Sequence, residues 1–481
     1  MYCDQEAISI SRSLACWMMG AALLLLSIPF GRAAAAEEAS VKIDVAERHQ
    51  VIEGFGASGA WWPSWVGKYP QEKRDQLLDL LFTADKGIAL SIYRHNLPSG
   101  GGAEIARPER ATAKVETVPG QFDLSADKKS LDILRGVRRR GVERFVLFSN
   151  SPPGRLTRNG LTSGGEKGGS NLRPGEEAAF AEYLLDLATL VRREYDLPHV
   201  SLSPINEPQW KWGEKWRGQE GCHFTPQEAA AVIRATVEAS ERRKTGFWIE
   251  APESGKWEGT AEYAEALFAD PLIDKGVEEI AIHSYWTNPG NRKKEAEIFR
   301  QKFPNKRIAM TEFCEMKHGH ALGMDSALEV AGVIHDDLTV GNVVSWQWWL
   351  AVAGGGYRDG LIYAHPETQK IEPTKRLWVL GNYSRFVRPG FVRVEATATD
   401  GLKATAFLSP DGARLVCVVI NPTDEPIEAT LETPGFEGRQ AATYVTDEDR
   451  DLEKVDDPAA GAAAELPAQS VSTVVMDGNA P

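Results

Sequence analysis

Cysteine is scarce in this chain of 481 residues, which contains five. Cys3 and Cys16 fall within the first 36 residues, so Cys222, Cys314 and Cys417 remain in the rest of the sequence. An odd and widely spaced set of this kind excludes a fold held together by a disulfide framework. Cys417 lies within the apolar run 415–420 and is predicted to be a buried small hydrophobe, whereas a bridge between Cys222 and Cys314 stays open.

Long apolar runs are also rare. A single one stands out, and it lies at the N-terminus. Arg12 precedes the apolar run 14–30, and four alanines at 33–36 then supply small residues suited to signal cleavage. This layout predicts a secretory signal peptide over residues 1–36 and a secreted or periplasmic protein. Pro29 interrupts the run near its end, and an uncleaved membrane anchor is the alternative. No second run is long enough to span a membrane, so no membrane association is expected after signal removal.

An excess of positive charge, metal-ligand spacings and phosphate loops are lacking as well. The formal net charge is −14, which disfavours nucleic acid and anionic membranes as partners and is compatible with a neutral polysaccharide. No His, Cys and Asp residues stand at the spacings of a metal site, and no glycine-rich phosphate loop joins a strand to a helix. We therefore expect neither a metal nor a cofactor. The chain is also expected to be a monomer.

What the sequence does contain is a regular alternation of strand-like and helix-like segments. Eight strand-like runs are each followed by a helix-like run or a long loop, and they cover residues 51–58, 88–96, 142–151, 200–207, 247–252, 280–286, 307–313 and 343–349. Strands that alternate with helices form parallel βαβ units, and eight such units close into a barrel. The predicted fold class is therefore α/β, with a (β/α)8 TIM barrel over residues 41–389.

The C-terminal part of the chain follows a different pattern. From residue 390 onward, short strand-like runs are divided by Pro, Gly and Asp turns, which is typical of a small antiparallel sandwich. We predict a β-sandwich side domain over residues 390–481. Residues 41–45 alternate as a half-buried strand does, ahead of the first barrel strand.

Two glutamates stand where predicted barrel strands end. Glu207 follows Asn206 and precedes Pro208 at the end of the fourth strand, and Glu312 ends the seventh. In a parallel barrel the carboxyl ends of the strands carry the chemistry, and two carboxylates about 5–5.5 Å apart are what a retaining glycosidase requires. Two such neighbours do not both ionise readily, so one stays protonated. We assign Glu312 as the nucleophile and Glu207 as the general acid/base.

Other polar side chains end neighbouring strands. Arg94 and Asn96 close the second strand, and His283 and Tyr285 close the sixth. Arg94 is placed to hold a carboxylate ionised, and Tyr285 to donate a hydrogen bond to the nucleophile before attack. A structural ion pair for Arg94 and a buried core position for His283 are the alternatives. The long, glycine-rich loops 99–122 and 151–175 are expected to build the binding face.

Tryptophans gather near the same strand ends. Those at strand ends are Trp61, Trp62, Trp65, Trp286, Trp346 and Trp348, and Trp210 and Trp212 closely follow Glu207. An exposed indole is costly in water but offers a flat face to a sugar ring. We therefore expect a floor of indoles for a carbohydrate substrate, including Trp62, Trp346 and Trp348. Ordinary packing is the alternative for each of them.

Taken in order, these motifs resemble glycoside hydrolase family 30. The matching segments span nearly the whole chain after residue 36 and lie at 54–58, 91–97, 148–153, 206–208, 283–286, 311–313 and 380–390. Each motif is weak alone, but seven in the family's order make the resemblance specific. Within the family, the segments 56–62 and 219–224 look most like the endo-β-1,6-galactanase branch.

The resemblance implies a barrel fused to a sandwich that includes the N-terminal strand 41–45, and hydrolysis with retention of anomeric configuration. It implies the acid/base role for Glu207 and the nucleophile role for Glu312. By the same matching, the −1 subsite would be lined by Arg94, Asn206, His283, Tyr285 and Trp348, with Asn206 near the sugar 2-hydroxyl.

The predicted function is thus a secreted, retaining endo-β-1,6-galactanase that binds a polysaccharide or oligosaccharide. An exo-β-glycosidase, a xylanase or a glucanase of the same family is the alternative within the class. A non-catalytic carbohydrate-binding protein is the alternative of another class, and the presence of both glutamates argues against it. One departure from the family stands after Pro153, where Gly154 and Arg155 replace a common aromatic and leave Arg155 to meet an acidic or extended substrate.

Overall fold

The computed structural model describes residues 39–213, 217–399, 401–455 and 463–480. The predicted signal peptide, residues 1–36, lies outside these described residues. Within them, no helix is both long enough and apolar enough to cross a membrane.

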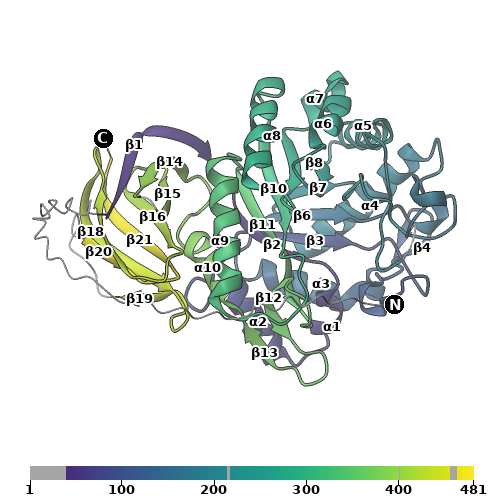
Figure 1. The fold of residues 1–481 in the computed structure, drawn as a ribbon. Helices are drawn as coiled ribbons and strands as arrows, with labels where there is room; N and C mark the ends of the chain where they lie inside the picture. Colours follow the sequence, from purple (N-terminus) through teal and green to yellow (C-terminus); the bar gives the residue numbers. More distant parts are fainter. Residues whose placement is uncertain (1–38, 214–216, 400, 456–462, 481) are drawn as a thin grey trace, which may run out of the picture. The chain divides into compact units, whose positions relative to one another are not determined.

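Eight parallel strands form the barrel, and helices surround it (Figure 1). In barrel order the strands are β2 (Gly54–Gly59), β3 (Ile92–Leu97), β6 (Arg144–Ser149), β7 (His199–Ser203), β8 (Trp248–Ser254), β9 (Glu279–His283), β10 (Arg307–Phe313) and β11 (Ser345–Ala353). Strand β11 pairs with β10 on one side and with β2 on the other, which closes the ring. The predicted TIM barrel and its eight strands are confirmed.

The barrel strands are largely apolar because both of their faces are covered. Every residue of β6 and of β11 is buried, since one face fills the barrel interior and the other meets the helices. Strand β12 (Gly360–Ala364) extends the sheet beside β11, and β13 (Ile371–Pro373) pairs antiparallel with β12. The small pair β4 (Glu116–Val118) and β5 (Gln121–Phe122) lies in the loop after β3.

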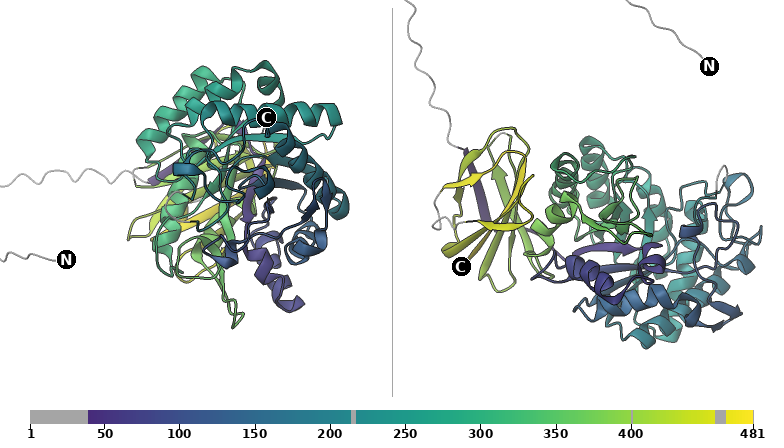
Figure 2. Two further views of the ribbon diagram at one scale, coloured as in Figure 1. Left: turned by 90° about the vertical axis from the view of Figure 1, so that its right-hand side faces the viewer. Right: turned by 90° about the horizontal axis from the view of Figure 1, so that it is seen from below.

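The helices around the barrel can be followed in two further views (Figure 2). They are α1 (Trp62–Val66), α2 (Gln71–Phe82), α3 (Lys128–Arg138), α4 (Glu177–Tyr195), α5 (Pro226–Arg243), α6 (Thr260–Phe268), α7 (Pro271–Gly276), α8 (Pro289–Lys302), α9 (Met324–Thr339) and α10 (Lys375–Ser384). Short 3₁₀ turns are η1 (Pro108–Arg110), η2 (Leu124–Asp127), η3 (Gly154–Leu156) and η4 (Glu166–Gly168). Helix α4 buries one apolar stripe at helical spacing, and Thr225 begins α5 with a capping box to Glu228.

A second, nine-stranded sheet carries the sandwich predicted for the C-terminal part. Its strands, in spatial order, are β19 (Glu453–Val455), β18 (Glu437–Thr446), β21 (Ser470–Asn479), β16 (Arg414–Asn421), β15 (Lys403–Leu408), β14 (Val392–Ala398), β1 (Ala39–Val51), β17 (Ile427–Glu432) and β20 (Ala463–Leu466). Neighbours are antiparallel except for β1 with β17. Strand β1, at the start of the described chain, therefore joins a sheet whose other strands all come from the C-terminal part of the chain.

Strand β16 shows how this sheet serves two hydrophobic cores. Val416 and Val418 belong to a core shared with the barrel, whereas Cys417 and Val419 belong to the sandwich's own core, because successive side chains point to opposite faces. The barrel helices α9 and α10 contact the sheet. The predicted burial of Cys417 is confirmed, and all three cysteines after residue 36 are free thiols.

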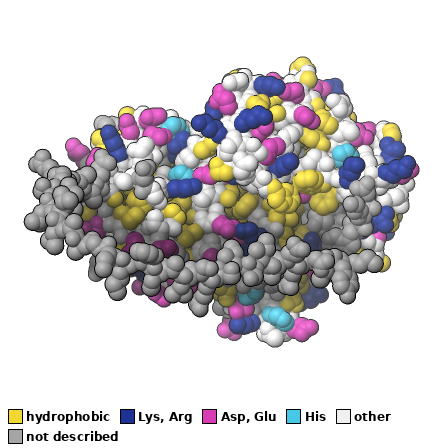
Figure 3. All heavy atoms as spheres, in the orientation of Figure 1, with side chains coloured by type: hydrophobic (Ala, Val, Ile, Leu, Met, Phe, Trp, Pro, Cys, Tyr) yellow, Lys and Arg dark blue, Asp and Glu magenta, His cyan; other side chains and the backbone are white. Residues whose placement is uncertain are grey.

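Acidic and basic side chains are interspersed over the described residues on the face that Figure 3 shows. Several exposed ion pairs occur among the described residues, as between Arg414 and Asp477 at 2.8 Å. Such pairs contribute little to stability because water and salt screen them. The packing of apolar strands and helices therefore stabilises this fold more than its surface charges do.

Asn382 on α10 links a barrel helix to the sandwich sheet. Its amide nitrogen donates to the backbone oxygen of Val471 at 3.2 Å and to Oγ1 of Thr473 at 2.9 Å. Its Oδ1 accepts from Oγ1 of Thr446 at 2.7 Å. The side chain is fully buried. If it were removed, no water could take its place as the hydrogen-bond partner of these groups.

Replacing Asn382 by alanine is expected to lower the free energy of unfolding by about 2–4 kcal/mol, because several buried polar groups lose their partner at once. Urea unfolding measures the change. Asn305→Ala, at an exposed position, is the control and should stay within about 0.5 kcal/mol of the parent. Equal effects of the two substitutions would contradict the linking role of Asn382.

Candidate active site

A cavity of about 500 Å³ opens at the carboxyl ends of the barrel strands. It is lined by residues that follow β3, β7, β9, β10 and β11, which is why residues distant in the sequence meet there. Glu207, Glu312, Asn206 and Tyr285 all line it. The aligned strand ends thus bring the two glutamates chosen from the sequence to one site.

The carboxyl groups of Glu207 and Glu312 lie close together in this cavity. One oxygen of each, together with a ring nitrogen of His283, lie within 4.8 Å of one another. Inverting glycosidases hold their two carboxyl groups about 6.5–9.5 Å apart to admit a water molecule, and retaining ones hold them closer. The backbone φ of Glu207 is 46°, an uncommon value for a residue other than glycine, at the turn after β7. The spacing suits direct attack by one carboxylate on a bound sugar.

Glu312 is surrounded by hydrogen-bond donors. Nη1 of Arg94 donates to Oε2 of Glu312 at 2.6 Å, and the hydroxyl of Tyr285 donates to Oε1 at 3.0 Å. Nη2 of Arg94 donates to Oδ1 of Asn206 at 2.8 Å. Arg94 is fully buried, and its Cζ lies 3.8 Å from the ring centre of Phe148. These donors stabilise an ionised Glu312.

His283 lies between three carboxyl groups. Its Nδ1 lies 3.3 Å from Oε1 of Glu207 and 3.7 Å from Oε1 of Glu312, and its Nε2 lies 3.0 Å from Oε2 of Glu253. Burial by itself lowers the pKa of His283, but Glu312, Glu207 and Glu253 outweigh it and raise that pKa to about 9. The imidazole is therefore a cation at neutral pH and donates from both nitrogens.

Opposing effects act on the pKa of Glu312. Burial raises the pKa of Glu312, while the cations of His283 and Arg94 oppose that rise and Glu207 adds to it. Arg94 and Tyr285 donate to Glu312, whereas the ring of His283 lies beside Glu207, and two carboxyl groups so close together do not both ionise readily. The site can therefore supply one carboxylic acid and one carboxylate to the same substrate bond.

Trp62, Trp346 and Trp348 do not line the cavity, which corrects the expectation from the sequence. All three are buried, and their indole nitrogens donate hydrogen bonds to other protein groups. Because successive residues of a strand point to opposite faces, Trp346 and Trp348 share the face of β11 that turns away from the cavity. Trp349, one residue further on, lines the cavity in their place.

The indoles that line the cavity are Trp210, Trp212, Trp286 and Trp349. Trp286 is 59% exposed and meets Trp210 edge-on, with 5.6 Å between ring centres. An indole so exposed beside two carboxyl groups offers a stacking surface for a sugar ring. Trp210 and Trp212 closely follow Glu207 in the sequence, so their place in the cavity could be foreseen.

Three charged residues of the cavity wall, Arg107, Arg110 and Asp359, were not singled out from the sequence. The Cζ of Arg110 lies 4.3 Å from the ring centre of Trp61. Burial and the neighbouring Arg107 lower the pKa of Arg110, and burial raises the pKa of Asp359 to about 6. The length of the loop after β3 indicated a binding face, but loop length does not say which side chains turn inward.

Arg155 is held away from the cavity by an ion pair. Its Nε and Nη2 donate to the two carboxylate oxygens of Glu116 at 2.7 and 2.8 Å. A bidentate pair of this kind occupies the planar guanidinium. Arg155 thus has a partner within the chain, and its contact with an acidic or extended substrate stays a prediction.

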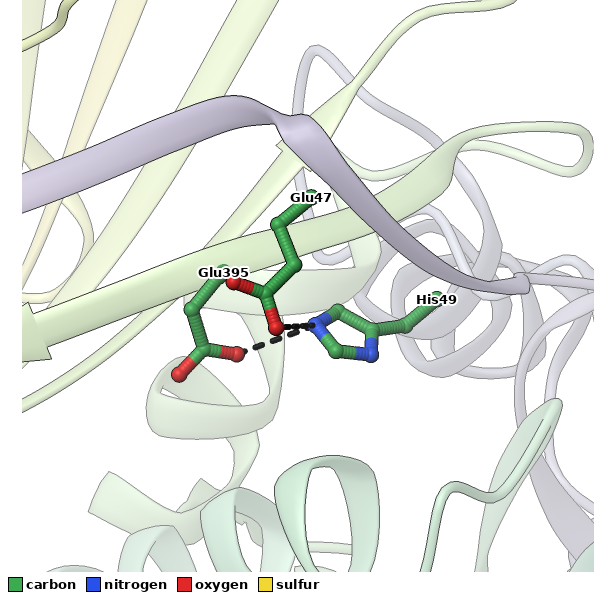
Figure 4. A group of neighbouring side chains, drawn as sticks. All are labelled: Glu47, His49 and Glu395. Atoms are coloured by element: carbon green, nitrogen blue, oxygen red, sulfur yellow. Dashed lines mark hydrogen bonds and ion pairs between the residues drawn. The ribbon is translucent and has the colours of Figure 1, made fainter.

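Two groups of His and Glu side chains among the described residues are close enough together to hold a metal ion. One is the catalytic cluster, where Arg94 and the protonated His283 already supply the counter-charge. The other is Glu47, His49 and Glu395, on β1 and β14 (Figure 4). Nε2 of His49 lies 2.9 Å from Oε2 of Glu395, and that same oxygen lies 3.6 Å from Arg393. This second group is a partly exposed ion-pair cluster.

Glu220 ties together two loops that line the cavity. It is fully buried, and its Oε1 accepts from the backbone nitrogen of Gly101 at 2.7 Å and from Oγ1 of Thr112 at 2.8 Å. Burial raises the pKa of Glu220 to about 7, and the hydrogen bonds limit that rise. The loop after β3 and the loop after β7 are thus joined through a carboxyl group that is protonated below neutral pH.

Comparison with known protein families identifies the class of protein. The O-Glycosyl hydrolase family 30 model matches residues 38–270 and 275–363, and the Glycosyl hydrolase family 30 beta sandwich domain matches residues 390–474. The chain therefore belongs to glycoside hydrolase family 30 and is an O-glycosyl hydrolase, and retention of configuration is typical of this family. The resemblance inferred from the sequence is confirmed.

Relatives of the chain carry several activities. Glucuronoxylanase XynC of Bacillus subtilis is 23% identical and aligns with 96% of this chain and 97% of that protein. An endo-beta-1,6-galactanase of Hypocrea rufa is also 23% identical, over 80% of this chain and 81% of its own. Among solved structures, a conserved exported protein of Bacteroides fragilis is 25% identical with a TM-score of 0.81, covering 91% of this chain and all 100% of the other. The family is shared, whereas the glycans named for these relatives differ.

The pKa of Glu220 predicts how stability changes with pH. Because the folded-state pKa lies near 7 and the ordinary value is 4.5, stabilisation by the bound proton is complete below pH 4.5 and is lost as the pH rises to 7. The expected slope is about 1.4 kcal/mol per pH unit at most in this window.

Glu220→Gln should remove this slope, so the free energy of unfolding of the variant should rise relative to the parent between pH 5 and pH 8. Urea unfolding at both pH values measures the difference. Glu109→Gln, an exposed residue of the loop after β3, is the matched control and should leave the slope unchanged. A parallel pH dependence of Glu220→Gln and parent would refute the prediction.

Proposed function

We propose that this protein is an exported, retaining endo-glycosidase that cleaves β-1,6-linked galactan. The observation that carries the proposal is the pair Glu207 and Glu312, whose carboxyl oxygens lie within 4.8 Å of each other in a cavity walled by indoles. This spacing supports a double displacement through a covalent glycosyl-enzyme.

Each step has a residue to perform it. In the first step, a carboxylate oxygen of Glu312 bonds to the anomeric carbon, the glycosidic C–O bond breaks, and the leaving oxygen takes the proton of Glu207. In the second step, a water molecule attacks the anomeric carbon and gives a proton to Glu207, and Glu312 leaves as a carboxylate. Arg94 and Tyr285 orient Glu312, and Asn206, itself held by Arg94, would meet the sugar 2-hydroxyl.

The galactan assignment is supported by the sequence resemblance at 56–62 and 219–224 and by the relative from Hypocrea rufa. Gln219, in the second of these segments, lines the cavity and accepts a hydrogen bond from Arg110 at 3.2 Å. An open cavity with the exposed Trp286 supports attack within a chain, because neighbouring sugars can extend past the catalytic pair.

A second candidate substrate, an acidic xylan, is favoured by one observation. Arg107 and Arg110 both line the cavity and present positive charge there, which suits a uronate substituent. The glucuronoxylanase of Bacillus subtilis, which aligns with nearly the whole chain, supports the same candidate.

Export is part of the proposal because a glycan of this kind lies outside the cell. The pattern of residues 1–36 supports it, as does the structural neighbour described as an exported protein. We propose that the mature protein acts as a monomer, since one chain supplies both carboxyl groups and the whole wall of the cavity described here.

Substitution of the two glutamates should separate their roles. Glu312→Ala is expected to lose turnover, and azide should restore part of it with inverted product, because the small anion occupies the space of the missing nucleophile. Glu207→Ala should lower kcat/KM on an unactivated glycan by about 10²–10⁴-fold and spare aryl glycosides with good leaving groups, which need no acid. Near-normal hydrolysis of an unactivated glycan by both variants would overturn the assignment.

A product profile on defined polysaccharides should decide the glycan. The panel is de-arabinosylated arabinogalactan, glucuronoxylan, β-1,6-glucan and β-1,3-glucan. We expect a ladder of short β-1,6-galacto-oligosaccharides. Monosaccharide as the sole product would contradict endo action, and cleavage of glucuronoxylan alone, lowered at least tenfold in Arg110→Gln, would establish the second candidate.

A further inference from the structure

Glu253 is a third carboxyl group buried beside the catalytic pair. It is the penultimate residue of β8, its side chain is fully buried, and its backbone φ is 59°. A residue other than glycine rarely adopts such a backbone, so the surrounding contacts must favour it. The catalytic cycle described above makes no use of this residue.

Glu253 contacts Arg94, His283 and the backbone of Glu207. Its Oε2 lies 3.0 Å from Nε2 of His283 and 3.6 Å from Nη2 of Arg94, and it accepts from Oγ1 of Thr311 at 2.5 Å. Its backbone oxygen accepts from the backbone nitrogen of Glu207 at 2.8 Å. Glu253 therefore contacts Arg94 and His283, the two cations beside the catalytic carboxyl groups, and also the backbone of Glu207. Its own side chain does not line the cavity.

We propose that Glu253 is a positioning residue that fixes the proton count of the catalytic pair, by holding Arg94 and His283 as cations so that one proton remains on Glu207. The inference rests on the roles proposed above for Glu207 and Glu312.

Charge balance leads to this conclusion. Two cations, Arg94 and His283, face three carboxyl groups, and a buried cluster is stable only when its charges compensate. Neutrality then requires one carboxyl group to keep its proton. Glu253 has two hydrogen-bond donors and the guanidinium of Arg94 at 3.6 Å, and Glu312 has two close donors, so we assign the remaining proton to Glu207. Burial would raise the pKa of Glu253, but Arg94 and His283 lower it to about 2, so it stays ionised.

The groups that face Glu253 come from each neighbouring strand. They are Arg94 from β3, Glu207 after β7, His283 from β9, Thr311 and Glu312 from β10, and Glu250 earlier on its own strand. Glu250 lies nearest Arg144, at 3.3 Å, and its charge also acts on Arg94 and Glu253 without a direct ion pair.

The same balance holds through the reaction. When Glu312 becomes a neutral glycosyl ester, Glu207 has given its proton to the leaving oxygen and has become the anion. The sum of charges is unchanged, and Nδ1 of His283, 3.3 Å from one carboxyl group and 3.7 Å from the other, faces whichever is ionised. A permanent anion at Glu253 keeps His283 protonated in both states, so no proton needs to enter or leave the buried cluster apart from the one that is transferred.

The test is the pH profile of Glu253→Gln on whichever unactivated glycan the parent cleaves. Loss of one fixed negative charge weakens proton binding by its neighbours, so the alkaline limb of kcat/KM should move down by at least one pH unit, with KM nearly unchanged. At a pH above the original limb this is a loss of at least tenfold. Glu253→Asp keeps the charge and should restore the limb to its original position.

Glu279→Gln is the matched control, because it removes another buried carboxylate at the opposite end of the barrel, beside Arg144 and Arg307. Its alkaline limb should stay in place. A uniform loss of activity in Glu253→Gln with unmoved limbs would overturn the inference and leave Glu253 a structural residue. That result is distinct from failure of the proposed function, which would appear as activity retained in Glu207→Ala and Glu312→Ala.

A measurement on the unsubstituted protein covers the case in which Glu253→Gln does not fold. Nitrogen-15 NMR of histidine-labelled protein, assigned with His283→Asn, should show an imidazolium at His283 at pH 8. A neutral imidazole there at pH 7 would refute the charge count.

Discussion

Burial of charge at the mouth of the barrel is the constraint on which this structure depends. Arg94 is fully buried, and its guanidinium reaches Glu312, Asn206 and Glu253 at once. An arginine in that position without these partners would be destabilising, because desolvation of an unpaired charge costs several kcal/mol. The partners lie on β8, on β10 and in the turn after β7, so only the closed ring of strands brings all of them to Arg94. Glu312 and Asn206, which pair with the buried Arg94, are therefore also groups of the catalytic site.

The other end of the barrel meets the same constraint in a different way. Arg144, at the start of β6, contacts Glu53, Glu250 and Glu279, and Arg307 adds a second cation there. This cluster seals the amino ends of the strands and takes no part in the cavity. One end of the barrel therefore has its charge pairs at the closed amino ends of the strands, and the other has them beside the cavity. The difference lies in access, since the cavity at the carboxyl ends admits a substrate.

Loops and the sandwich act on the site at longer range. Glu220 joins the loop after β3 to the loop after β7, so both walls of the cavity share one buried carboxyl group. The sandwich packs on α9 and α10, and Asn382 satisfies backbone and hydroxyl groups of its strands. These contacts hold the frame, whereas Arg110, Trp286 and Trp349 line the cavity itself. Substitutions in the cavity wall can therefore change its lining without changing the frame.

The sequence by itself determined the barrel, the sandwich and both glutamates. The strands could be predicted because apolar runs bounded by turns reflect burial on two faces, which is a local pattern. Glu207 and Glu312 could be predicted because a parallel barrel places all its strand ends at one mouth. Tertiary structure alone decided that Trp349 lines the cavity, since neighbouring Trp348 lies on the opposite face of β11 and a run of indoles does not reveal which face turns inward. It also decided that Arg155 pairs with Glu116 and that Glu253 contacts His283 and Arg94. Such pairs join residues far apart in the chain, and only the folded barrel sets their distances.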